Sequence, residues 1–172
     1  MKVALKITGP MLDLVRRDLA RPHFFAHERV GFLTAGAAAV PGGLLLLVRG
    51  YMPVADDDYE VAPGVGARIG SNAMRKAAQS AYRPASTLLH VHTHGGRGLP
   101  GFSGVDLKSG NEFVPGFFQS CPKMPHGLLV LSDNGATGLL WLETGKPSVS
   151  IDRFIRIDQP IVEQWGAKYE LA

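Results

Sequence analysis

The stretch that most constrains the fold of this chain is a short apolar run that leads into histidines and then into glycines. Leu88-Leu89-His90-Val91 is followed by His92 and His94, and the run breaks at Gly95-Gly96. An apolar run of this length, stopped by glycines, predicts a buried β-strand that ends in a loop. Because side chains at positions i and i+2 of a strand lie on the same face, His90, His92 and His94 are predicted to project together.

A serine and an aspartate follow these histidines along the chain. Ser103 and Asp106 come after the glycine-rich loop, so the Asp106 carboxylate could return to the imidazoles once the loop folds back. Two nitrogens, one carboxylate oxygen and an open fourth position characterise a catalytic zinc site, whereas a structural zinc site is closed by four protein ligands. Spacing alone leaves open which two of the three histidines bind the metal. His94 is the strongest candidate, because it is the nearest of them to the loop and to Asp106 along the sequence.

The same residues carry a resemblance to a known family. His92-Thr93-His94, followed by Ser103-Gly104-Val105-Asp106, resembles the His-x-His and Ser-x-x-Asp signature of the JAMM metalloproteases, in particular their stand-alone prokaryotic JAB-domain type. That family has an upstream glutamate before a Gly-Leu-Leu-x-Gly-like strand, and Glu28 before Val30–Gly36 fits this element. Two departures fall in the loop: Gly95 stands where the family usually has proline, and the gap to the serine is one residue longer.

The resemblance implies a JAB/MPN (cytidine-deaminase-like) fold and a zinc-dependent hydrolysis of amide bonds. It implies one Zn²⁺ per chain held by His92, His94 and Asp106, with Glu28 as general base and Ser103 as the stabiliser of an oxyanion. No organic cofactor is expected. The implied substrate is the C-terminal tail of a ubiquitin-like protein or its conjugate, and E1-like and E2-like proteins of the same pathway are the implied partners.

The pattern of elements predicts the fold class independently. Apolar and alternating runs predict strands, helical spacing and alanine-rich stretches predict helices, and no linker or repeat divides the chain. We therefore expect a single α/β domain over residues 1–172, an α+β sandwich with a mixed sheet flanked by helices. The expected strands are 2–7, 30–39, 44–48, 88–94, 127–131, 138–142 and 149–157, and the expected helices are 11–19, 71–82 and 107–118, the last interrupted at Pro115-Gly116.

Composition narrows the class of protein further. The chain has 172 residues, of which 45% are hydrophobic and 19% charged, which is ordinary for a globular domain. The net charge of +3 comes without any basic block, so nucleic acid is not an expected partner. The longest apolar run, Leu44–Val48, is far too short to span a bilayer, so no membrane is expected either. A single cysteine, Cys121, excludes an intramolecular disulfide and suits a reducing compartment, so a cytoplasmic location is expected.

Simpler interpretations remain open for two acidic elements. Glu28 could cap a helix or pair with a surface arginine such as Arg29, in which case it would have no catalytic role. The run Asp56-Asp57-Asp58 could meet a basic substrate tail, but a solvated loop is the commoner explanation for such a run. His23 and His27, which lack a partner at ligand spacing, are interpreted as structural.

Three other functions compete with the leading one. His90-Val91-His92-Thr93-His94 also resembles the opening motif of PHP-type phosphoesterases, but those need further ligands downstream, and only His126 follows His94. A metal-free MPN scaffold would bind partners without catalysis, although such relatives have typically lost ligands. A metal-dependent peptidase of another specificity, trimming a sulfur carrier or a small conjugate, would keep all of these residues.

Overall fold

The computed structural model describes residues 1–24, 26–62, 64, 66–158 and 162–165, the last four by their backbone alone. The strands are β1 (Lys2–Thr8), β2 (Val30–Val40), β3 (Gly43–Pro53), β4 (Thr87–Thr93), β5 (His126–Leu131), β6 (Ala136–Trp141), β7 (Val149–Ser150), β8 (Arg153–Ile157) and β9 (Val162–Trp165). The helices are α1 (Gly9–Leu19), α2 (Ser71–Tyr82) and α3 (Gly104–Ser120), with a 3₁₀ turn, η1, at Asp56–Asp58. In the described part of the chain, the strands form one mixed sheet.

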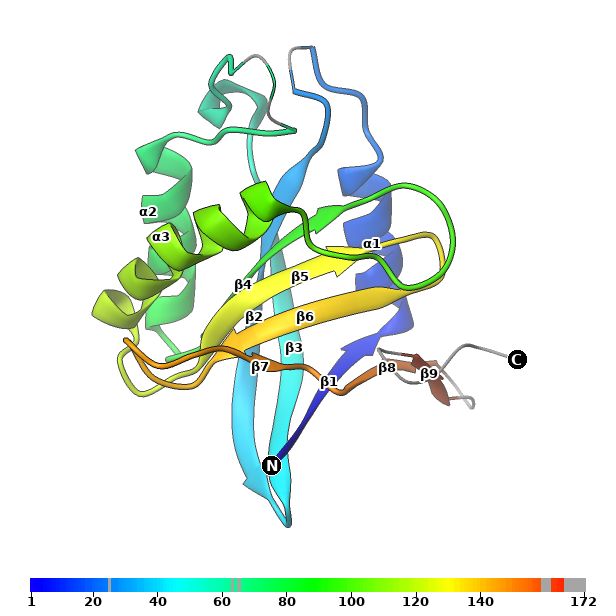
Figure 1. The fold of residues 1–172 in the computed structure, drawn as a ribbon, viewed down its shortest axis with the longest axis vertical. Helices are drawn as coiled ribbons and strands as arrows, with labels where there is room; N and C mark the ends of the chain where they lie inside the picture. The colour runs from blue at the N-terminus through cyan, green and yellow to red at the C-terminus, as the bar shows by residue number, and fades with distance from the viewer. Residues whose placement is uncertain (25, 63, 65, 159–161, 166–172) are drawn as a thin grey trace.

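The sheet is strongly curled, with the long β2–β3 hairpin running across the direction of β5 and β6 (Figure 1). It has nine strands in the order β7-β6-β5-β4-β2-β3-β1-β8-β9. The strand that carries the histidines, β4, is an inner strand, antiparallel to β2 and parallel to β5. Pairing on both edges fixes the register of β4, and therefore the face on which each histidine side chain lies.

Helices cover both faces of the sheet, with α1 on one side and α2 and α3 on the other (Figure 1). Alternation along β4 divides its side chains between the two layers: Leu89 and Val91 pack in the cluster with α1, whereas Leu88 packs in the cluster with α2 and α3. His90 and His92 are in phase with Leu88 and so lie on the α2/α3 face. The predicted mixed α/β class is confirmed.

Two predicted elements differ from the structure. The helix after Asp106 is not interrupted at Pro115-Gly116, because α3 continues to Ser120. Proline removes one backbone hydrogen bond from the helix, and burial of Val114, Phe117 and Phe118 against the sheet holds the two halves in line. The predicted strand 149–157 is two strands in the structure, β7 and β8, separated by Ile151-Asp152.

The acidic run is solvated in part: Asp56 and Asp57 are exposed, whereas Asp58 is buried. Asp56 forms an ion pair with the buried Arg29 at 2.7 Å, and Asp58 accepts hydrogen bonds from Asn72 and Lys76 of α2 at 2.6 and 2.7 Å. The interpretation as a solvated run is therefore wrong for Asp58 alone, although Asp56 is also held in an ion pair. They tie η1 to the segment before β2 and to α2.

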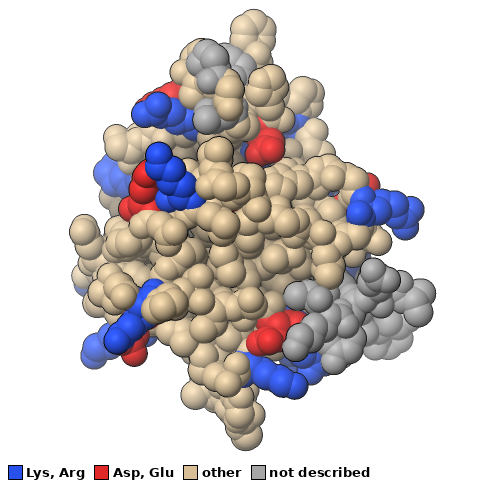
Figure 2. Space-filling view, viewed as in Figure 1, with Lys and Arg blue, Asp and Glu red and all other residues tan. Residues whose placement is uncertain are grey.

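The surface seen in Figure 2 is largely uncharged in its middle, with acidic and basic side chains interspersed around it. None of the helices in the described residues is long and apolar enough to cross a membrane.

Candidate metal centre

The two histidines of the His-x-His pair meet where β4 ends. His92 lies on the strand and is 3% exposed, whereas His94 is the first residue after Thr93, the last residue of β4. The His94 backbone N–H donates to the Leu131 carbonyl at 2.9 Å, so pairing with β5 extends one residue beyond the strand. Alternation is thereby maintained, and the two imidazole Nε2 atoms lie 3.2 Å apart.

Asp106 comes to the same point from the first turn of α3. The Ser103 side chain accepts a hydrogen bond from the Asp106 backbone N–H at 3.1 Å, and the Asp106 carboxylate accepts one from the Ser103 backbone N–H at 2.7 Å. This reciprocal pair is a capping box, which sets both the start of the helix and the orientation of the carboxylate. One carboxylate oxygen lies 3.4 Å from His92 Nε2 and the other 3.5 Å from His94 Nε2.

The electrostatics of the cluster keep Asp106 ionised. Burial raises the pKa of its carboxyl group, but hydrogen bonds with the His92 ring and with Ser103 outweigh this, so the pKa lies well below its usual range. An ionised carboxylate beside two imidazole nitrogens is a donor set that suits zinc.

The spacing of these atoms can be tested against zinc coordination. A tetrahedral zinc ion bound at about 2.0–2.2 Å holds its ligand atoms roughly 3.3–3.6 Å apart. The two imidazole Nε2 atoms are 3.2 Å apart, which is close to one edge of such a tetrahedron. Asp106 approaches His92 with one carboxylate oxygen, at 3.4 Å, and His94 with the other, at 3.5 Å, so either oxygen of this carboxylate lies at ligand spacing from one imidazole. One feature is unusual: His92 Nδ1 is buried without a hydrogen-bond partner in the described structure, so the acceptor that usually orients a metal-binding imidazole is not supplied there.

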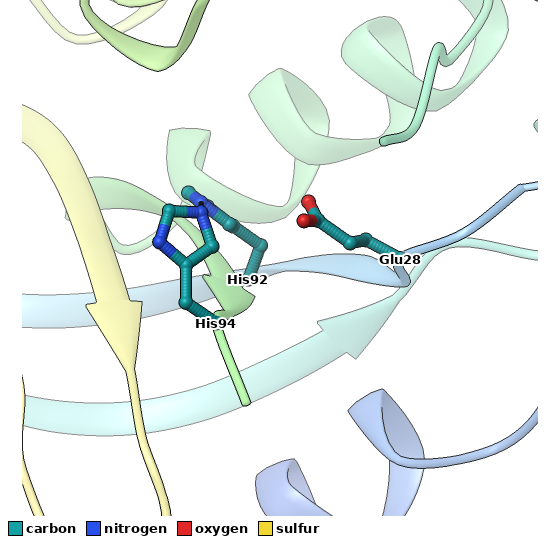
Figure 3. Close-up of side chains that lie close together, drawn as sticks. All are labelled: Glu28, His92 and His94. Atoms are coloured by element: carbon teal, nitrogen blue, oxygen red, sulfur yellow. Dashed lines mark hydrogen bonds between the residues drawn. The ribbon is translucent and has the colours of Figure 1, made fainter. Parts of the chain in front are cut away.

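Glu28 reaches the cluster from the segment before β2. Figure 3 shows its carboxylate directed toward the two imidazoles. One ligand atom from each of Glu28, His92 and His94 lies within 4.8 Å of the others, and these three residues form a group that could hold a metal ion. Both histidines therefore lie close to two acidic groups, the carboxylates of Glu28 and Asp106.

The backbone around Glu28 is fixed by its pairing with a distant segment. The Gly66 carbonyl accepts from the backbone N–H groups of both His27 and Glu28, at 2.8 and 3.0 Å. A Cβ atom added at Gly66 would lie 2.5 Å from Glu28 Oε2. Glycine at this position therefore leaves the space that the Glu28 carboxylate occupies.

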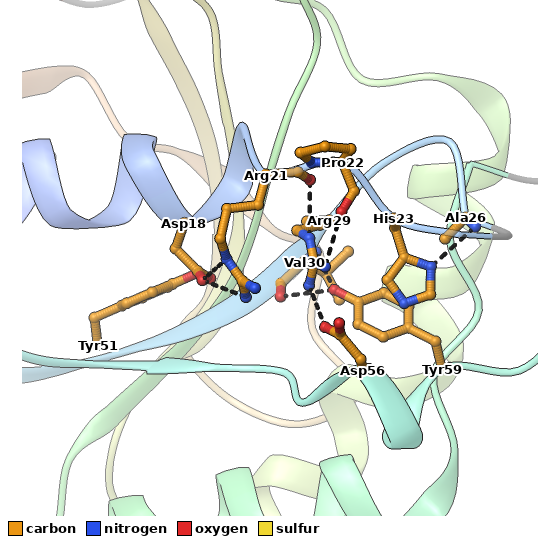
Figure 4. A network of polar contacts seen from close by, with 10 residues as sticks. All are labelled: Asp18, Arg21, Pro22, His23, Ala26, Arg29, Val30, Tyr51, Asp56 and Tyr59. Atoms are coloured by element: carbon orange, nitrogen blue, oxygen red, sulfur yellow. Dashed lines mark hydrogen bonds and ion pairs between the residues drawn. The ribbon is translucent and has the colours of Figure 1, made fainter.

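A polar network anchors the same segment on its other side (Figure 4). Arg29 is 3% exposed and donates to the carbonyls of Arg21 and Pro22 at 2.9 and 3.0 Å, as well as to Asp56. Arg29 therefore pairs with Asp56 and not with Glu28, and none of the described residues forms an ion pair with Glu28. The simpler interpretation that Glu28 pairs with Arg29 is wrong.

His23 belongs to this network as a structural residue, as the sequence indicated. Its Nδ1 atom accepts a hydrogen bond from the Ala26 backbone N–H at 3.1 Å, and its ring lies 4.3 Å from that of Tyr59. The Tyr59 hydroxyl in turn accepts from the Val30 backbone N–H at 2.9 Å. These contacts join the segment that carries Glu28 to the start of β2.

All the site residues that the sequence indicated line one cavity. Glu28, His92, His94, Ser103 and Asp106 border a cavity of about 380 Å³ between the α2/α3 layer and the sheet. His90, whose part was left open, also lines this cavity and does not belong to the pair of imidazoles in contact. Burial and the neighbouring His92 lower the His90 pKa to about 3, so its ring is neutral.

Comparison with known proteins adds little to this geometry. No family model matches the chain, and no curated protein matches it. Among solved structures, the STIL N-terminal domain from Trichoplax adhaerens is similar with 11% sequence identity and a TM-score of 0.35, covering 79% of this chain and 40% of that one. The chain therefore spans well under half the length of that structure. A TM-score this low does not establish a shared fold, so this similarity assigns no function to the chain.

Proposed function

We propose that the protein is a JAMM-type zinc-dependent peptidase or isopeptidase that cleaves an amide bond at the C-terminal tail of a ubiquitin-like protein. The observation that carries this proposal is the convergence of His92, His94 and Asp106 at 3.2–3.5 Å, with the Glu28 carboxylate beside them. In this proposal the first three residues bind the metal, Glu28 transfers protons, and the fold is of the JAB/MPN type.

Each side chain has a role that its position allows. Bound zinc supplies Lewis acidity, which activates water and polarises the amide carbonyl. Glu28 accepts the proton of the attacking water and delivers it to the leaving amine, since it lies beside the imidazoles without an ion pair to any described residue. The Ser103 hydroxyl accepts a bond from the Asp106 backbone and keeps its own proton available for a developing oxyanion.

The choice of substrate follows from the resemblance and from the shape of the site. Residues 66–69 border the cavity in a continuous row. In this proposal a substrate tail lies along them and presents its scissile carbonyl to the metal-binding group. A ubiquitin-like protein ends in such a tail. E1-like and E2-like proteins of the same pathway are the partners that we propose, and the cytoplasm is the proposed location.

The proposal is tested with a ubiquitin-like protein joined through its C-terminus to a lysine side chain in one substrate and to a peptide in another. We expect the zinc-loaded protein to release the tail, with mass spectrometry identifying the bond that is cut, and a chelator to stop the reaction. If neither substrate nor any shorter tail peptide is cleaved, the proposed peptidase activity is wrong. A metal-free protein would favour the alternative of a non-catalytic scaffold.

Replacing Ser103 should separate its capping role from its chemical role. Ser103→Gly removes the hydroxyl but costs only a few tenths of a kcal/mol at an N-cap, whereas Ser103→Ala costs about 0.5–2 kcal/mol of stability. We expect turnover by both variants to be slower by about 10²- to 10³-fold, the effect of removing an oxyanion donor. Cleavage rates and thermal denaturation measure the two effects. If Ser103→Gly cleaves normally, the hydroxyl acts only as a cap.

Gly66→Ala should displace Glu28 without disturbing the metal ligands. The added methyl group meets the movable end of the Glu28 side chain, so the fold should survive while the carboxylate moves. A shift of about 1 Å can slow a reaction roughly 100-fold, so we expect turnover to be slower by about one to two orders of magnitude, with unchanged zinc content. Gly101→Ala, whose Cβ would meet no atom within 4 Å, is the matched control. Equal rates for the two variants would contradict the position assigned to Glu28.

A further inference from the structure

The cavity beside the candidate metal centre extends well beyond the residues that the reaction needs. The site residues form one part of its wall, and its total volume is about 380 Å³. Cavities that bind small molecules measure roughly 300–1,000 Å³, so this space is large enough to hold a chemical group of the substrate. Water activation and proton transfer alone do not require a cavity of this size.

The inner wall of the cavity is apolar and is built from several elements. Its apolar side chains come from β2, the segment before α2, α2 itself, α3 and β5, and are Val30, Ile69, Met74, Phe113 and Leu128. His90 lies among them, with its ring 5.1 Å from that of Phe113 and at 75° to that of Phe32. An aromatic side chain of the substrate can pack against these rings in the same tilted or edge-on geometry.

The cavity is lined by few charged residues, and they lie either at the candidate metal centre or at the exposed rim. Glu28 and Asp106 belong to the candidate metal centre, while Arg68 and Glu112 are exposed. Arg68 also forms an ion pair with Glu60 at 3.1 Å. Apart from the metal-binding group, the polar side chains of the lining are Arg68 and Glu112, which are exposed, together with Ser109 and the neutral His90. The remaining lining is largely hydrocarbon and aromatic surface, which favours an apolar occupant over a charged one.

We propose that this cavity receives an apolar side chain of aromatic size from a residue next to the scissile amide bond. The proposal rests on the function proposed above and narrows its substrate class. A tail with glycine on both sides of the bond would leave the cavity unfilled. A leucine or phenylalanine on one side would transfer its apolar surface from water into it, and this transfer favours binding. The cavity thereby makes the protein a peptidase that selects a bulky residue at the cut.

The first test varies one residue at a time in a tail peptide cleaved by the zinc-loaded full chain. Glycine, leucine, phenylalanine and lysine are placed on the acyl side of the bond in one series and on the amine side in another. On one of the two sides, we expect phenylalanine or leucine to raise kcat/KM at least about tenfold over glycine, while lysine gives no such gain. Cleavage with no preference on either side would overturn the cavity proposal and leave the peptidase activity standing.

A second test measures binding without turnover, using the products of each side. Calorimetry with zinc-loaded protein compares N-acetylphenylalanine with N-acetylglycine for the acyl side, and phenylalanine amide with glycine amide for the amine side. We expect at least about tenfold tighter binding of the phenylalanine compound on one side. This preference without any peptide cleavage would support the cavity and contradict the proposed function. Equal binding in both pairs would contradict the cavity proposal itself.

A variant connects the preference to this cavity. Ala67 lines the cavity and packs against the apolar cluster under α2, so Ala67→Leu should fill part of the space. The ratio of kcat/KM for phenylalanine over glycine should then fall toward one, and Ala67→Ser, which adds little volume, should keep it. If Ala67→Leu does not fold, Met74→Ala gives the opposite test, since a wider cavity should shift the preference toward tryptophan. An unchanged ratio in a folded variant would place the selecting group elsewhere.

Discussion

Glu28→Gln is expected to remove most of the hydrolytic activity while the protein keeps its fold and its zinc. Glutamine has nearly the shape of glutamate, but its amide cannot accept the proton of an attacking water. Positioned general acid–base groups contribute roughly 10²- to 10⁴-fold to enzyme rates, so turnover should be slower by a factor of this size. Cleavage assays and elemental analysis on the same preparation measure the two quantities.

The control for this variant is Glu143→Gln, which removes one negative charge from an exposed position in the β6–β7 connection. Its turnover rate should equal that of the wild type. If Glu28→Gln loses zinc together with activity, Glu28 is a metal ligand, as its membership of the group with His92 and His94 permits. If Glu28→Gln cleaves at the wild-type rate, Glu28 has no part in the reaction.

His94→Ala is expected to remove metal binding and, with it, all activity. The variant leaves only His92 and Asp106 of the proposed ligands, and two ligands hold zinc far more weakly than three. A ligand that binds only the folded state stabilises it by about 2.7 kcal/mol when present at 100 times its Kd. The wild type should therefore unfold at a higher temperature when zinc is added, and His94→Ala should show no such shift.

His27→Ala is the matched control, because it also removes one imidazole, and that imidazole is exposed. The hydrogen bond between His27 and Gly66 is made by the His27 backbone N–H, so the substitution keeps it. Its response to zinc should match that of the wild type. If zinc raises the unfolding temperature of His94→Ala as much as that of the wild type, His94 is not a ligand. His90 would then be the next candidate for the second histidine ligand.

Much of the fold follows from local patterns in the sequence. The run Leu88–Val91 is apolar because β4 is an inner strand covered on both faces, and the histidines keep the alternation of that strand. The helix of residues 71–82 is visible in its alanine stripe, which is buried in the structure. Continuity of α3 through Pro115 was not predictable in this way, since it depends on packing against a sheet formed by other parts of the chain.

Some features of the candidate site were also predictable from local sequence patterns, and others were not. Alternation predicted that His90, His92 and His94 would share one face, but the choice of His92 and His94 as the pair depended on the motif. The return of Asp106 also depended on the motif, because spacing does not determine the path of a glycine-rich loop. The sequence Ser103-Gly104-Val105-Asp106 also contained a signal that was missed, the Ser-x-x-acid pattern of a capping box.

Contacts between distant residues carried no local signal. Nothing near Arg29 indicates that it pairs with Asp56, and nothing near Gly66 indicates that it lies against Glu28. The apolar cavity is assembled from five separate elements, so its lining could be recognised only in the folded chain.

The most direct test of the proposed metal centre is the zinc content of the purified wild-type protein after zinc is supplied and excess metal is removed. We predict one zinc per chain, held by His92, His94 and Asp106, because the imidazole Nε2 atoms are 3.2 Å apart and each lies 3.4–3.5 Å from one of the two Asp106 carboxylate oxygens. A protein that retains no zinc would contradict this prediction. The short separations would then be a hydrogen bond between imidazoles and ion pairs to Asp106, and the proposed hydrolysis would have no metal to depend on.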